Sequence, residues 1–383
     1  MGVTAARGFR AAGVAAGLKS SGDPDVALVV NDGPDDAAAA VFTTNRFPAA
    51  PVQWSRQVLS TGRLRAVVLN SGGANACTGP EGFADTHATA EHTAAALGLG
   101  AIDVAVASTG LIGMRLPMDR LLPGVTEAAA RLAADGGPDA ARAIMTTDSV
   151  PKTAVHGGEG WTVGGMAKGA GMLAPSLATM LVVLTTDAAV PADVLQPALE
   201  TATRLSFERV DSDGCLSTND TVVVMANGAG GVTPTAEELT EALTAVCTDL
   251  AMQLLADAEG STKDIAITVR NAATVDDALT AGRACARNNL LKTALFGNDP
   301  NWGRVLAAIG TTDAAFEADR VDVTINGVTV CRGGAIGDPR EGVDLTGRAI
   351  TIDVDLAAGS EQATIWTNDL SIAYVHENSA YST

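Results

Sequence analysis

Residues 168–188 read KGAGMLAPSLATMLVVLTTDA. A Gly/Ala-rich run breaks at Pro175, and an apolar run then extends from Met180 to Leu184. A short apolar run bounded by turn residues is typical of a buried strand. The single hydroxyl residue Thr179 stands where the loop meets that strand. The stretch therefore predicts a core strand, and it raises the question of why a threonine stands at the strand's entrance.

Strand-like and helix-like patterns alternate on both sides of this stretch, which predicts a mixed α/β fold, a layered α/β sandwich. The strand-like runs cover residues 26–30, 39–44, 65–71, 103–108, 180–184, 221–226, 264–269, 321–325, 328–332, 349–356 and 364–367. The helical patterns cover residues 84–97, 126–137, 235–258 and 275–295. Asn326-Gly327 predicts a type I′ hairpin, and Thr235 with Glu238 predicts a capping box.

Length, charge and cysteine usage limit the possible functions. The 383 residues suggest two domains, with a boundary near 185–200 where Pro191 and Pro197 follow the apolar strand. A net charge of −19 argues against nucleic acid or an anionic membrane as partner. No stretch reaches the length of a membrane span, so we expect a cytoplasmic protein. The five cysteines are widely spaced, and we expect them to be small core residues.

Three common chemistries find little support in the motifs. His87 and His92 are five residues apart and do not share a helix face, and no H-E-x-x-H occurs, so we expect no metal. A G-x-S-x-G nucleophile elbow is absent from the sequence. GAGMLA at 169–174 matches a loose dinucleotide-binding pattern, but Pro175 and a strand follow it where that pattern needs a helix.

Thr179 offers a different chemistry. A threonine hydroxyl is a useful nucleophile only when a base takes its proton. An N-terminal threonine carries that base itself, because an α-amino group has a reference pKa of about 7.7–8.0. An internal threonine becomes N-terminal when its hydroxyl attacks the preceding carbonyl and water cleaves the resulting ester, here at Ala178–Thr179. Small residues before Thr179 favour the strained geometry of that attack, although an ordinary strand entry explains the same residues.

Several segments, in order along the chain, carry a resemblance to one family. They are NSGGANACTG (70–79), STGLIG (108–113), IMTTD (144–148), WTVGGMAKGAG (161–171), the opening stretch, STNDTVVVMANG (217–228), FGNDPNWGR (296–304) and ENSAYST (377–383). Together they closely resemble the ornithine acetyltransferase family, the glutamate N-acetyltransferases of arginine biosynthesis. The resemblance covers essentially the whole chain.

The resemblance implies a self-cleaving enzyme. Cleavage between Ala178 and Thr179 would give an alpha chain, 1–178, and a beta chain, 179–383, that stay associated, as a heterotetramer of two alpha and two beta chains. Thr179 would then accept acetyl from N-acetyl-L-ornithine, release L-ornithine and pass the acetyl group to L-glutamate, giving N-acetyl-L-glutamate by a ping-pong mechanism. No cofactor is implied, but some family members also take acetyl from acetyl-CoA.

The family's site residues fall on named positions of this chain. Thr109 and Gly110 would form the oxyanion hole, although Thr-Gly is also a common turn pair. Substrate contacts would come from Thr147 (with Thr146 as the alternative), Lys168, Thr179, Glu259, Asn378 and Thr383. Lys168 is a lone cation in a glycine-rich stretch, and its alternative is a solvated loop lysine. Glu259 stands against the dipole at a predicted helix end, and its alternative is a surface pair with Lys263.

Two other functions use the same residues. A self-cleaving amidohydrolase or aminopeptidase would pass the acyl group from Thr179 to water instead of to an amine. A binding protein would keep the fold without turnover. Acceptor choice depends on details of the pocket rather than on the nucleophile, so the nucleophile alone does not separate the first of these from an acetyltransferase.

Overall fold

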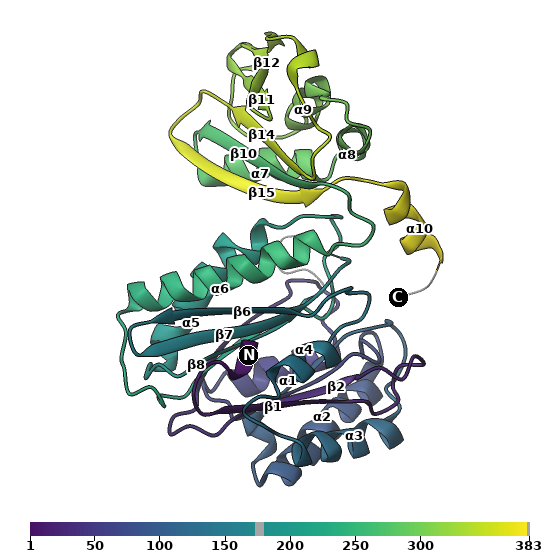
Figure 1. Ribbon diagram of the computed structural model, residues 1–383, viewed down its shortest axis with the longest axis vertical. Coiled ribbons are helices and arrows are strands. Elements are labelled where there is room, and N and C mark those ends of the chain that lie inside the picture. The colour runs from purple at the N-terminus through teal and green to yellow at the C-terminus, as the bar shows by residue number, and fades with distance from the viewer. Residues whose placement is uncertain (173–179, 381–383) are drawn as a thin grey trace.

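The computed structural model describes residues 1–172 and 180–380 of the chain (Figure 1). Its strands form three sheets, one of which lies in a separate body above the other two in Figure 1. The predicted mixed α/β class is confirmed. Every strand-like run named from the sequence coincides with a strand whose bounds differ by a few residues at most.

Two sheets pack face to face at the centre of the larger body. The four-stranded sheet has the order β1-β2-β4-β5 and consists of β1 (Phe9–Val14), β2 (Val26–Asn31), β4 (Ala66–Asn70) and β5 (Val104–Ser108). The five-stranded sheet has the order β3-β9-β8-β7-β6 and consists of β3 (Ala37–Phe42), β9 (Thr221–Ala226), β8 (Leu181–Thr186), β7 (Trp161–Lys168) and β6 (Lys152–Gly158). Apolar residues of both sheets, such as Val29 and Val183, share one core between them.

Helices cover the outer faces, so the larger body has four layers (Figure 1). α5 (Ala192–Leu205) and α6 (Ala236–Ala256) lie on the five-stranded sheet, and α2 (Gly79–Leu97) and α3 (Met118–Ala130) lie on the four-stranded sheet. α1 (Ala50–Leu59) and α4 (Gly137–Ala143) instead pack on the inner side of the four-stranded sheet, where Val58 and Ala140 join the core between the two sheets. α6 begins at the predicted capping box, and although it is long and apolar enough to cross a membrane, its buried residues belong to this core.

The separate body is built on a six-stranded sheet with the order β13-β12-β11-β14-β10-β15. Its strands are β10 (Asp264–Ala272), β11 (Asp322–Ile325), β12 (Val328–Arg332), β13 (Ala335–Ile336), β14 (Ala349–Asp355) and β15 (Glu361–Asn368). Its helices are α7 (Val275–Ala286), α8 (Asn289–Phe296) and α9 (Trp302–Ile309). Asn326 and Gly327 both have positive φ, at 44° and 84°, which confirms the predicted hairpin. After β15 the chain continues into α10 (Ile372–Ala380), which extends from the separate body toward the side of the larger body (Figure 1).

β7 was not predicted, because its glycines hide the strand pattern. A Cβ at Gly164 would lie 2.1 Å from the carbonyl oxygen of Gly2, so only glycine lets the N-terminal turn approach the strand. A Cβ at Gly165 would lie 2.7 Å from a methyl group of Leu184. β7 lies between β8 and β6 in the sheet, and its last residue is Lys168.

Four further expectations need correction. Residues 185–200 lead from β8 into α5 within the larger body and mark no structural division, whereas the chain leaves the larger body between Ala256 and Asp264. Of the helix predicted over 126–137, residues 126–130 form the end of α3, and residues 131–136 form the connection to α4. The helix predicted over 275–295 divides before α8, where Asn288 caps a new helix. Cys77 and Cys215 are exposed, whereas the other three cysteines are buried.

Candidate active site

Five segments far apart in sequence meet around one open cavity of about 100 Å³. They are the end of β5, the loop after α4, the end of β7, the loop after α6, and α10. The lining residues are Thr109, Gly110, Thr146, Thr147, Lys168, Gly171, Met172, Glu259 and Asn378. The described residues of the predicted site therefore share one cavity at the ends of the two packed sheets.

Thr109 and Gly110 form a tight turn directly after β5. The backbone N–H of Thr109 donates to the carbonyl of Asn70 at 3.0 Å, which holds the turn against the neighbouring strand β4. Gly110 has φ of 131°, and a Cβ there would lie 2.8 Å from the backbone nitrogen of Gly73. Within the described residues the Gly110 N–H has no acceptor. A hydroxyl and a free backbone N–H side by side at a cavity are the donors that an oxyanion hole needs.

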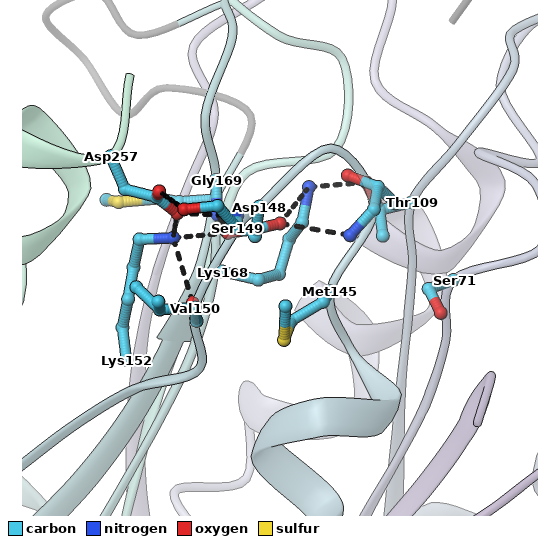
Figure 2. Close-up of polar contacts among 12 residues, drawn as sticks. Ser71, Thr109, Met145, Asp148, Ser149, Val150, Lys152, Lys168, Gly169 and Asp257 are labelled. Carbon is cyan, nitrogen blue, oxygen red and sulfur yellow. Dashed lines mark hydrogen bonds and ion pairs between the residues drawn. The ribbon is translucent and has the colours of Figure 1, made fainter. Parts of the chain in front are cut away.

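Lys168 ends β7 inside this site and is only 2% exposed. Its Nζ donates to Thr109 Oγ1 at 3.3 Å and lies 4.0 Å from the nearer carboxylate oxygen of Asp148. Figure 2 shows the lysine side chain reaching between these two residues. The alternative of a solvated loop lysine is wrong, because β7 carries the side chain into the interior.

Asp148 is the centre of a buried network that links the cavity walls (Figure 2). Its Oδ1 accepts from Lys152 Nζ at 2.6 Å and from the backbone N–H of Gly169 at 2.7 Å. Its Oδ2 accepts from the backbone N–H of Thr146 at 3.0 Å. Lys152 Nζ also donates to Asp257, the residue that caps the C-terminal end of α6, at 2.5 Å. Buried charges at these distances are paired and hydrogen-bonded, as burial requires.

Burial and neighbouring charge act in opposition on the network. Burial alone would raise the pKa of Asp148, but the attraction of Lys168 and Lys152 outweighs it and lowers the pKa to about 2. Burial lowers the pKa of Lys168, and the carboxylate of Asp148 opposes that shift. Asp148 is thus a fixed anion that favours the charged form of the lysine beside it.

Glu259 lines the cavity from the loop after α6, and Asn378 lines it from α10. The backbone N–H of Glu259 donates to the carbonyl of Ala170 at 2.9 Å, and a Cβ at Gly171 would lie 2.8 Å from its carboxylate. The proposed surface pair with Lys263 is wrong, because that ammonium donates to backbone carbonyls of Leu345 and Gly347. Asn378 is exposed on α10, where its amide donates to the carbonyl of Tyr374 at 3.0 Å.

Ala178, Thr179 and Thr383 lie outside the described residues. Met180, which follows Thr179 in sequence, is buried, and its N–H donates to Asp220 Oδ1 at 3.1 Å. Burial raises the pKa of Asp220 well above its usual value, against the opposing effect of that N–H. Both Thr146 and Thr147 line the cavity, so the choice between them stays open.

Asp148, Lys152 and Asp220 were not predicted as site residues from the sequence. Asp148 ends the quoted segment IMTTD, but its role depends on two lysines that only the fold brings to it. A lysine in the sequence KTAVHGG gives no sign that its side chain is fully buried. An aspartate directly before an apolar strand, as in NDTVVVMA, was the one local signal for Asp220.

Comparison with known proteins identifies the family. The model of the ArgJ family matches residues 10–383 of the chain. The chain belongs to the ArgJ family. As a member of this family, it is an acetyltransferase of arginine biosynthesis, as the resemblance implied.

Two relatives of this ArgJ-family protein are named "Arginine biosynthesis bifunctional protein ArgJ". The one from Streptomyces coelicolor is 64% identical, with all of both chains covered. The one from Mycobacterium tuberculosis is 60% identical, with all of this chain and 96% of the relative covered. Among solved structures, ornithine acetyltransferase from M. tuberculosis, complexed with ornithine, is 64% identical with a TM-score of 0.45, over 47% of this chain and 96% of that one.

Proposed function

We propose that this protein transfers acetyl from N-acetyl-L-ornithine to L-glutamate through an acetylated Thr179, after cutting itself at Ala178–Thr179. The observation that carries the proposal is the common cavity of Thr109, Gly110, Thr147, Lys168, Glu259 and Asn378. These residues come from segments far apart in the sequence, and the family resemblance predicts all of them as site residues. Membership of the ArgJ family supports the same assignment.

Self-cleavage prepares the nucleophile. The Thr179 hydroxyl attacks the carbonyl carbon of Ala178, the C–N bond breaks as the C–O ester forms, and the freed nitrogen becomes the α-amine. Water then hydrolyses the ester, leaving a carboxylate on Ala178 and an N-terminal Thr179. The α-amine supplies the base that an internal threonine lacks.

Acetyl transfer then follows in two half-reactions. The Thr179 hydroxyl adds to the acetyl carbonyl while its own α-amine takes the proton. Thr109 Oγ–H and the Gly110 N–H stabilise the oxyanion, and the α-amine returns the proton to the nitrogen of departing ornithine. The α-amine of glutamate attacks the acetyl ester in the reverse sequence. N-acetyl-L-glutamate leaves and the free hydroxyl is restored.

Charge complementarity supports the choice of substrates. N-acetylornithine carries one carboxylate and one side-chain ammonium, and the described cavity wall offers Lys168 and Glu259. Thr147, Asn378 and Thr383 would add hydrogen bonds to these charged ends. Acetyl-CoA as a second acetyl donor, a cytoplasmic location, and a heterotetramer of two alpha and two beta chains complete the proposal.

Intact-mass spectrometry tests this scheme. The purified protein should give two fragments, 1–178 and 179–383, and brief exposure to N-acetylornithine should add one acetyl group to the second fragment. Thr179→Ala should abolish both the cut and the acetylation, whereas Thr179→Ser keeps a hydroxyl and should retain the cut. An uncleaved wild-type chain with full activity would overturn the scheme.

The amidohydrolase alternative gives a different product balance. The enzyme is incubated with N-acetylornithine with and without glutamate, and free acetate is measured beside N-acetylglutamate. The acetyltransferase should release ornithine in turnover amounts only when glutamate is present. Acetate release that is independent of glutamate would favour the hydrolase.

A further inference from the structure

The hydroxyl of Thr109 is the one side-chain donor of the proposed oxyanion hole, and its direction depends on a neighbour. Lys168 Nζ lies 3.3 Å from Thr109 Oγ1. An ammonium has three donors and no acceptor, so a charged Lys168 forces this hydroxyl oxygen to accept. The hydroxyl hydrogen is then free to point into the cavity, and within the described residues it has no other acceptor.

A neutral Lys168 would have the opposite effect. Its amine nitrogen carries a lone pair, and the hydroxyl can donate to it. The Thr109 hydrogen would then point away from the cavity, and the oxyanion would lose one of its two donors. The charge on Lys168 thus decides the direction of a hydrogen bond at the proposed catalytic site.

We propose that Asp148 and Lys168 are positioning residues that hold the Thr109 hydroxyl in the donor orientation for acetyl transfer. This inference rests on the proposed function, because it needs Thr109 to face the oxyanion. Asp148 keeps the lysine charged in a buried position, 4.0 Å away, and is itself fixed by Lys152, Gly169 and Thr146. Lys168 therefore acts through Thr109, in addition to any contact with a substrate carboxylate.

The charged groups around Lys168 set the sign of each expected change. Asp148 from the loop after α4, Glu259 from the loop after α6 and Asp220 before β9 favour its charged form, whereas Lys152 from β6 and Lys19 from the loop after β1 oppose it. Burial is the largest influence and lowers the pKa of Lys168. The rate of acetyl transfer should therefore decline on the alkaline side at a pH below the pKa of an exposed lysine.

The first test is the pH profile of kcat at saturating N-acetylornithine and glutamate, expressed per cleaved molecule. Asp148→Asn removes an attractive charge, so the alkaline limb should move to lower pH by about one to three units. Lys152→Met removes a repulsive charge, so the limb should move to higher pH. A role in folding alone would not shift the limb in opposite directions, and unshifted limbs in both variants would overturn the inference.

The second test asks whether Lys168 acts through Thr109. Thr109→Val keeps the shape of the side chain but removes the hydroxyl. Its kcat should be lower at neutral pH, and the alkaline limb that belongs to Lys168 should disappear. Lys168→Met should lower kcat strongly in the wild-type background and hardly further in the Thr109→Val background. Additive losses of kcat would show that the lysine acts independently of the hydroxyl.

The outcomes separate this inference from the proposed function. An unchanged kcat in Thr109→Val would contradict the oxyanion role itself, whereas a slow Thr109→Val enzyme that keeps its alkaline limb contradicts only the link to Lys168. Lys263→Met is the matched control, since Lys263 is also buried but donates to carbonyls in the separate body. If Thr109→Val stays uncleaved, the opposite shifts in Asp148→Asn and Lys152→Met still decide the question.

Discussion

At the scale of single residues, Gly110 combines a positive φ with a close backbone contact. Gly110→Ala should displace the turn, because the new Cβ would lie 2.8 Å from the Gly73 nitrogen, and the misplaced N–H should lower kcat by about 10²–10³-fold. Steady-state kinetics per cleaved molecule checks this. Gly113→Ala is the control, since Gly113 also has positive φ but open space around it. Equal losses in both variants would mean that backbone strain alone is responsible.

Glu259 gives a second prediction at this scale. Glu259→Gln keeps the size of the side chain but removes the charge that would bind the side-chain ammonium of N-acetylornithine. The KM for N-acetylornithine should rise about tenfold, as expected for the loss of about 1.4 kcal/mol, while the KM for glutamate changes less. Initial rates with each substrate varied in turn measure this, beside the exposed control Glu317→Gln. A larger effect on glutamate would contradict the assigned role.

At the scale of elements, β7 determines where Lys168 enters the site. Gly164→Ala would place a methyl group 2.1 Å from the Gly2 carbonyl oxygen and force two backbone segments apart. We expect a loss of about 1–3 kcal/mol in the free energy of unfolding, as for other overpacked sites, measured by denaturant titration. Gly157→Ala in the neighbouring strand is the control, because its nearest contact would be an ordinary 3.7 Å. A Gly164→Ala variant as stable as the control would contradict close packing here.

Local patterns predicted most of the described strands but missed β1, β6, β7 and β13 and, among the described helices, α1, α4, α5, α9 and α10. The apolar run at β8 and the capping box at α6 carry their own signals, so both were found. β1 and β7 contain few large apolar residues, and their place in a sheet depends on partners elsewhere in the chain. Other backbone segments lie so close to these strands that only small residues fit there. Small residues do not show the alternation of apolar and polar side chains by which a strand is recognised in a sequence.

At the scale of the whole molecule, Lys292 joins the separate body to the larger one. Its Nζ donates to the carbonyl of Ser212 and, at 3.0 Å, to Thr367 Oγ1. Arg287 and Asp211 form a second link at 2.7 Å, and Ser212 donates to Asn368 at 2.7 Å. These contacts hold the body that carries α10, and with it Asn378, beside the cavity.

Lys292 makes a testable contribution to stability. Burial lowers its pKa to about 8, against the attraction of nearby aspartates. The unfolded chain therefore binds more protons between about pH 8 and 10.4, so the contribution of Lys292 to stability should rise across that window, by at most about 3 kcal/mol. Lys292→Met should remove this rise. Unfolding free energies of both proteins at several pH values measure it, and a constant difference across the window would contradict it.

The sequence by itself predicted the chemistry: a threonine preceded by small residues with an α-amine as its base, a Thr-Gly turn after a strand, and a series of segments along the chain that resemble one family. These signals are local or depend on residue order, so one chain is enough to reveal them. Only the tertiary structure decided that Lys168 is buried against Thr109 and Asp148. It also decided that Glu259 lines the cavity and does not pair with Lys263. The charge and hydrogen-bond direction of a side chain depend on its burial and on neighbours from distant segments, and the fold alone brings these together.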